Sequence, residues 1–112
     1  MKAMPYIVVH GHMTACKPKD ATHVLLKMPG PMPYRLIPVI LKGSRKGTHC
    51  WSWNGDTEKP TLKPSIKSWD GVRTKPGVTV CHTWINDGQA QFLADCTHEL
   101  AGQTLDLLDV EE

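Results

Sequence analysis

Hydrophobic and polar side chains alternate most clearly at the start of the segment 78–104. One set of alternate positions holds Val78, Val80, His82 and Trp84, and the other holds Thr79, Cys81, Thr83 and Ile85. This two-residue period is typical of a β-strand. Asn86-Asp87-Gly88 then predicts a tight turn, because glycine adopts positive φ without strain. Residues 89–94 would return as the partner strand, so the pattern predicts a hairpin over 78–94, closed by a two-residue Asp-Gly turn or by a three-residue turn with a glycine bulge.

The rest of the chain consists of short apolar or alternating runs interrupted by proline and glycine. Further strands are expected at 5–10, 22–28, 35–41, 48–53 and 103–110, with an extended segment at 59–67 and a loop at 69–77. Pro38 lies inside one run and favours an edge strand or a bulge, because proline cannot donate to a ladder. Residues 97–101 are expected to form one helical turn, capped by Asp95 or Thr97 and ended by Gly102.

These elements predict an all-β or β-rich α+β fold. We expect a small antiparallel sandwich or open barrel with the 78–94 hairpin at its centre. The 112 residues can bury one modest core, so residues 1–112 are expected to form a single domain.

Charge is distributed unevenly along the chain. Residues 1–50 carry eight Lys or Arg and the single acid Asp20, whereas residues 51–112 carry five basic and ten acidic residues. A basic half could attract nucleic acid, but no aromatic residues interleave with the lysines, so nucleic acid is not an expected partner.

The four cysteines form no C-x-x-C pair, and no secretion signal is visible, because the apolar run 5–9 is too short. The longest apolar run, 36–41, could not span a bilayer. We therefore expect a cytoplasmic protein with reduced thiols and no membrane association.

Residues that could take part in catalysis or metal binding lie at the open end of the predicted hairpin. The outgoing strand begins at Cys81-His82, and the return strand ends near Asp95 and His98. Ser65 follows Pro60 and Pro64, which keep its segment extended. Ser65 as nucleophile, His82 as base and Asp95 as the group that orients the base would form a hydrolytic triad. His98 is then a reserve base or a transition-state donor.

The same residues allow other chemistry. Cys81 could be a nucleophile with His98 as its base, but not with His82, because adjacent strand residues point to opposite faces. No cofactor is expected for hydrolysis, although zinc is an alternative. The zinc ligands would come from Cys50, Cys81, Cys96, His82 and His98. A second group, His10, His12 and Cys16, is either a metal loop or a polar turn.

Four motifs resemble a known family. They are W-x-W-N-G at 51–55, P-T-x-x-P-S at 60–65, C-H at 81–82 and D-x-T-H-x-L-A-G-Q-T at 95–104. In this order they resemble a family of small bacterial and phage proteins that long carried only a domain-of-unknown-function label. Relatives occur in operons for ubiquitin-like conjugation and are taken to be deconjugating peptidases. The resemblance implies hydrolysis of peptide or isopeptide-like bonds, with a protein substrate such as a ubiquitin-like protein. The chain lacks the C-x-C-G-C knuckle of many members.

A different class of function is a non-enzymatic phage protein that binds and blocks a host factor. Its interface anchors would be the four tryptophans, Trp51, Trp53, Trp69 and Trp84. The hydrolase, the zinc-binding domain and this binding module are the alternatives that the sequence leaves open.

Overall fold

The computed structural model describes residues 1–30, 33–41, 50–70 and 79–110. Nine strands form one sheet: β1 (Ala3–Val9), β2 (His12–Ala15), β3 (His23–Lys27), β4 (Tyr34–Ile40), β5 (Trp51–Trp53), β6 (Leu62–Asp70), β7 (Thr79–Asn86), β8 (Gln89–Phe92) and β9 (Thr104–Asp106). The helical content of the described residues is one 3₁₀ turn, Pro18–Asp20. The predicted all-β class is therefore confirmed.

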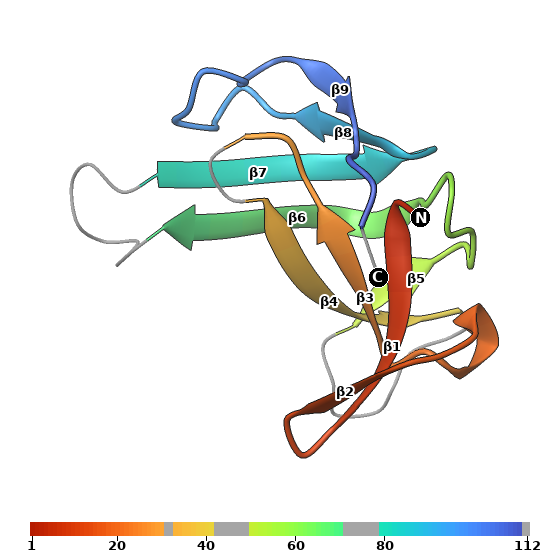
Figure 1. Cartoon of the computed structure of the whole chain (residues 1–112). Coiled ribbons are helices and arrows are strands. Elements are labelled where there is room, and N and C mark those ends of the chain that lie inside the picture. The colour runs from red at the N-terminus through yellow and green to blue at the C-terminus, as the bar shows by residue number, and fades with distance from the viewer. Residues whose placement is uncertain (31–32, 42–49, 71–78, 111–112) are drawn as a thin grey trace.

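The sheet has the order β2-β1-β3-β4-β5-β6-β7-β8-β9. All neighbouring strands are antiparallel except β4 and β5, which are parallel. Figure 1 shows the long strands β6 and β7 side by side, with β8 and β9 beyond β7. The sheet is therefore mixed but mostly antiparallel, and two-residue turns join β1 to β2 and β7 to β8.

The chain after β9 crosses back to the first strands. Leu108 forms an isolated bridge with Lys27, and its N–H donates to the Lys27 carbonyl at 2.9 Å. The Val110 N–H donates to the Met1 carbonyl at 2.7 Å. The two ends of the described chain therefore lie together, as Figure 1 also shows.

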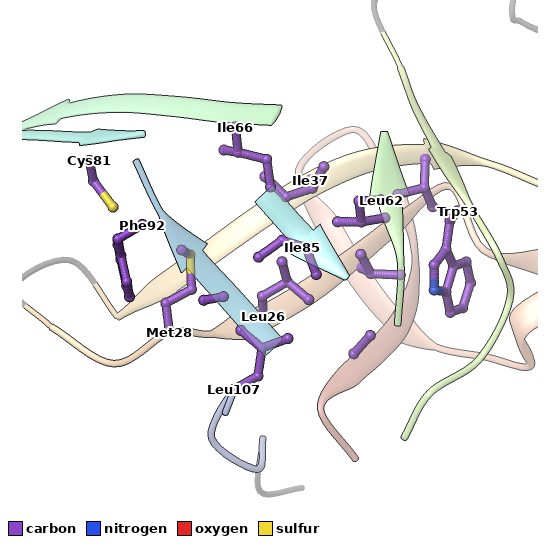
Figure 2. Packing of buried hydrophobic residues seen from close by; sticks show 14 of the residues in the cluster. Leu26, Met28, Ile37, Trp53, Leu62, Ile66, Cys81, Ile85, Phe92 and Leu107 are labelled. Atoms are coloured by element: carbon purple, nitrogen blue, oxygen red, sulfur yellow. The ribbon is translucent and has the colours of Figure 1, made fainter. Parts of the chain in front are cut away.

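The core lies on one face of the curled sheet (Figure 2). Its largest fully buried apolar side chains are Phe92, Leu26, Met28, Leu62, Ile85, Leu107, Val24 and Val39. In β7 the buried positions are Cys81, Thr83 and Ile85, which is one of the two alternating sets in the sequence. The other set, including His82 and Trp84, is half-buried, so His82 lies on the face opposite the core.

The hairpin of β7 and β8 has the shorter of the two expected turns, and it lies toward one edge of the sheet. Asn86 pairs with Gln89, and Asp87 and Gly88 have φ of 53° and 78°. Two successive positive φ values match the twist of a two-residue hairpin turn. Strand β8 ends at Phe92 rather than at residue 94, and Val78 lies outside the described residues.

Several local predictions need correction. The stretch His10–Cys16 is mostly strand, because β1 and β2 form a hairpin whose turn has His10 and Gly11 at positive φ. Pro38 does not mark an edge strand, because β4 lies between β3 and β5. The pairing of β4 with β5 begins only at Val39, after the proline, so the missing N–H of Pro38 costs that ladder no hydrogen bond.

Two other segments also differ from the prediction. Trp69 and Asp70 belong to β6, because they pair with Val80 and Thr79, whereas residues 71–77 lie outside the described residues. Residues 97–101 form separate hydrogen-bonded turns, such as Ala101 N–H to His98 carbonyl at 3.2 Å, and not a helical turn.

No helix in the described part of the chain has the length and apolarity to cross a membrane.

Candidate active site

Ser65 is presented by an irregularity in β6. Leu62 pairs with Ile85 and Ile66 with Thr83, so four residue steps on β6 face only two on β7. The additional residues bulge out of the ladder, a common device for redirecting a side chain next to an active site. The Trp51 indole N–H donates to the Ser65 carbonyl at 3.3 Å and ties the bulge to β5. Ser65 is therefore held by a bulge, and not by a regular extended strand as predicted.

His82 lies on the half-buried face of β7. Its side chain is 22% exposed, and its register partner on β6 is Lys67. Side chains of paired residues project from the same face of a sheet, so Lys67 and His82 are neighbours there. The imidazole is thus accessible but fixed by the strand that carries it.

A continuous hydrogen-bond chain joins Ser65, His82 and Asp95. The distance from Ser65 Oγ to His82 Nε2 is 2.9 Å. His82 Nδ1 lies 3.0 and 2.9 Å from the two carboxylate oxygens of Asp95. The structure therefore brings together the three residues singled out in the sequence.

The partners of His82 determine which ring nitrogen carries the proton. An ionised carboxylate only accepts, so Nδ1–H donates to Asp95. Nε2 of the neutral ring is then the acceptor, and the Ser65 hydroxyl donates to it. This arrangement directs the serine proton toward a base.

Asp95 reaches His82 from a tight turn after β8. The Cys96 N–H donates to the Leu93 carbonyl at 3.1 Å, which closes the turn. A regular continuation of the β7–β8 ladder would place Asp95 opposite Val80. The turn takes up additional residues, so Thr97 lies there instead, and its N–H donates to the Val80 carbonyl at 3.1 Å. Asp95 consequently projects over His82 and does not cap a helical turn.

The environment of Asp95 favours its charged form. The hydrogen bond from His82, followed by the Lys67 ammonium at 3.4 Å, lowers the pKa of the Asp95 carboxyl. Each group stabilises the carboxylate over the neutral acid. Asp95 is thus held in its ionised form, which can stabilise a positive charge on the His82 ring.

Cys96 is a contact of His82 whose role the sequence did not reveal. Its buried thiol accepts a hydrogen bond from the His82 N–H at 3.1 Å and donates to the His82 carbonyl at 3.2 Å. The same turn therefore contacts the His82 ring through Asp95 and the His82 main chain through Cys96. The adjacency of Asp95 and Cys96 was visible in the sequence, but the partner of the thiol was not.

The other candidates lie elsewhere. The His98 ring packs edge-on against Phe92 with centroids 5.2 Å apart, and its Nδ1 accepts from the Leu100 N–H at 3.3 Å. Among the described residues no hydrogen bond joins His98 to the Ser65–His82–Asp95 chain. Cys81 is buried with Phe92 in the core, where burial raises the pKa of its thiol (Figure 2). A buried neutral thiol is a poor nucleophile.

The metal alternatives find no convergent ligand set in the described residues. Nowhere in them do three His, Cys, Asp or Glu side chains lie close enough together to hold a metal ion. The His82 ring is already engaged at both nitrogens, and Cys81 points to the core face. Zinc therefore stays a hypothesis for metal analysis of the purified protein.

A hydroxyl, an imidazole and a carboxylate joined in this order form the arrangement of serine hydrolases, here on a curled all-β sheet. The family model of BubE, described as "Bacterial ubiquitination-like system serine protease", matches residues 34–93. The match covers more than half of the 112 residues, and the chain belongs to this family. The matched range includes Ser65 and His82 and ends two residues before Asp95.

Comparisons with curated proteins and with solved structures gave no match.

Proposed function

We propose that the protein is a serine peptidase in which Ser65, His82 and Asp95 are the nucleophile, the base and the residue that orients the base. The observation that carries this proposal is the unbroken hydrogen-bond chain, with 2.9 Å between Ser65 Oγ and His82 Nε2. Membership of a serine-protease family supports it independently.

The mechanism follows from the proton positions. As Ser65 Oγ attacks the substrate carbonyl carbon, His82 Nε2 takes the hydroxyl proton, and Asp95 stabilises the resulting imidazolium. The C–N bond then breaks, and the imidazolium gives its proton to the departing amine. Water, deprotonated by His82, hydrolyses the acyl-enzyme and regenerates the Ser65 hydroxyl.

The proposed substrate is a ubiquitin-like protein, either as a conjugate or as a precursor. The family description names a bacterial ubiquitination-like system, so the bond would be a peptide or isopeptide bond at the end of such a protein. The same chemistry serves both bonds, because they differ only in whether the leaving amine is an α-amine or a lysine amine.

The test is substitution of Ser65 and His82. Ser65→Ala and His82→Ala should each lower kcat at least about a thousandfold, because triad residues act as a unit. Ser68→Ala is the matched control, since Ser68 lies on the same strand opposite Cys81 and takes no part in the Ser65–His82–Asp95 hydrogen-bond chain, called the relay below. Cleavage of a ubiquitin-like fusion protein, followed by gel and mass spectrometry, measures the rates.

A serine-reactive phosphonate probe gives a second readout. It should label Ser65 in the parent protein and in Ser68→Ala, but not in His82→Ala. Full cleavage by Ser65→Ala would overturn the proposal, and labelling of Cys81 would transfer the role to the thiol.

The host-binding alternative has less support from the tryptophans. Trp53 is only 2% exposed and cannot be an anchor, whereas Trp51, Trp69 and Trp84 are half-buried. Retention of biological activity by Ser65→Ala and His82→Ala would favour this alternative.

A further inference from the structure

A pocket of about 320 Å³ lies beside the Ser65 bulge. Its lining residues come from the end of β4, from β5 and the turn after it, and from the start of β6: Leu41, Ser52, Trp53, Asn54, Thr61 and Lys63. Its volume falls within the range of small ligand sites. None of Ser65, His82 and Asp95 lines this pocket, so the proposed catalytic residues do not account for it.

Two lining residues have unused hydrogen-bond donors. Ser52 and Lys63 are register partners across β5 and β6, so their side chains project from the same face. Both are exposed, and within the described part of the chain neither side chain has a hydrogen-bond or ion-pair partner.

The other polar lining residues are occupied. Asn54 Oδ1 accepts from the Asp56 and Thr61 N–H groups at 3.2 and 3.1 Å, and its Nδ2 donates to the Lys59 carbonyl at 3.1 Å. Thr61 Oγ1 accepts from the Asp87 N–H at 3.0 Å. A ligand would therefore meet one ammonium and one hydroxyl beside the exposed apolar side chain of Leu41.

These groups define the ligand chemistry. An ammonium and a hydroxyl together suit a carboxylate, which only accepts hydrogen bonds. Lys63 precedes Ser65 by two residues in the irregular part of β6, so the pocket and the proposed nucleophile share one short segment. A substrate held at Ser65 would place a residue near the cleaved bond beside this segment.

We propose that this pocket is a specificity subsite that binds an acidic side chain of the protein substrate through Lys63 and Ser52. The assignment rests on the proposed peptidase function, because it places the acidic residue near the bond that Ser65 attacks.

Binding to Ser65→Ala tests the subsite without any catalytic step. The probes are acetylated, C-terminally amidated alanine hexapeptides that carry one central Glu or Gln. The Glu peptide should bind about two- to fivefold more tightly, which is the strength of an exposed ion pair, and added salt should reduce the difference. NMR titration should show shifts at the Ser52 and Lys63 backbone N–H groups.

Substitutions locate the interaction. Lys63→Gln in the Ser65→Ala background should abolish the preference for Glu, and Ser52→Ala should reduce it. Lys19→Gln is the matched control, because Lys19 is an exposed lysine in the 3₁₀ turn, outside the pocket.

Every other outcome overturns the subsite. Equal binding of the Glu and Gln peptides would do so, as would an unchanged preference in Lys63→Gln. A Gln peptide with a free C-terminal carboxylate forms a third arm, and its binding in preference to the Glu peptide would assign the pocket to a chain end. Because these measurements do not depend on cleavage, they can contradict the subsite while leaving the proposed peptidase function untouched.

Discussion

His82 is fixed at the ring and at the main chain by adjacent residues of one turn. Asp95 holds Nδ1 of the imidazole, and Cys96 contacts both the N–H and the carbonyl of the same residue. Serine hydrolases need this kind of orientation, because a misplacement of about 1 Å can lower the rate about a hundredfold. In the proposed mechanism Cys96 would therefore act through His82, as a positioning residue.

Cys96→Ala should lower kcat about ten- to hundredfold with little change in KM, because the His82 main chain loses both sulfur contacts. Cys96→Ser keeps a donor and an acceptor and should recover part of the rate. Steady-state kinetics measure the split. Cys16→Ala is the control, since Cys16 lies after β2 and contacts none of the relay residues. Equal loss in the Ser and Ala variants would argue for a packing role alone.

At the scale of elements, two irregular features place the site. The β6 bulge brings Ser65 toward His82, and the Asp87-Gly88 turn sets which residues of β7 and β8 face each other. The turn also packs against the loop before β6, because the Gly88 N–H donates to the Pro60 carbonyl at 3.0 Å. The hairpin turn and the segment that carries Ser65 are therefore connected at the start of β6, in addition to the β6–β7 ladder.

Gly88→Ala tests this connection. Its φ is +78°, and an added Cβ would lie 3.1 Å from the Glu58 carbonyl oxygen and 3.3 Å from Lys59 Cα. Gly11 is the matched control, because its φ is +81° but no atom lies within 4 Å of an added Cβ. Both variants carry the cost of positive φ, of about 1 kcal/mol, and Gly88→Ala should lose about 1 kcal/mol more. Urea unfolding measures the free energy of unfolding of both variants. Equal losses would show that the segment with Glu58 and Lys59 moves away from the added Cβ at little cost.

At the scale of the whole molecule, the chain after β9 holds the first and last strands together. Leu107 is 2% exposed in the core, whereas its neighbour Leu108 is 43% exposed although its N–H pairs with Lys27. This segment therefore links the half of the sheet that carries the site to β1 and β3.

Leu107→Ala should reduce the free energy of unfolding by about 2–4 kcal/mol, because it removes buried methyl groups and leaves a cavity. Leu108→Ala should cost less than about 1 kcal/mol, because its side chain is exposed and its main-chain bridge remains. Thermal and urea unfolding of the two variants give the comparison. A similar loss in both would mean that the exposed Leu108 side chain contributes as much stability as the buried Leu107 side chain.

The sequence alone predicted the all-β class, the hairpin and the three candidate residues Ser65, His82 and Asp95, but it missed β2. The two-residue alternation from Thr79 to Ile85 separates the core face from the opposite face, and Asn86-Asp87-Gly88 places the turn while leaving its length open. These are local properties, because strand period and turn geometry depend on neighbours in the chain. The position of Cys81-His82 and Asp95 in the predicted hairpin, with Ser65 on a proline-bounded segment, singled out the three residues before any distance was known, and the motifs added the family.

Only the tertiary structure decided how those residues meet. Ser65 and His82 are 17 positions apart, and their contact depends on the bulge in β6, which no sequence period predicted. The contacts of Cys96 and Lys67, and the pocket beside Lys63, likewise depend on pairing between strands. Strand partners and registers are set by long-range packing of one shared core, so residue order alone does not specify them.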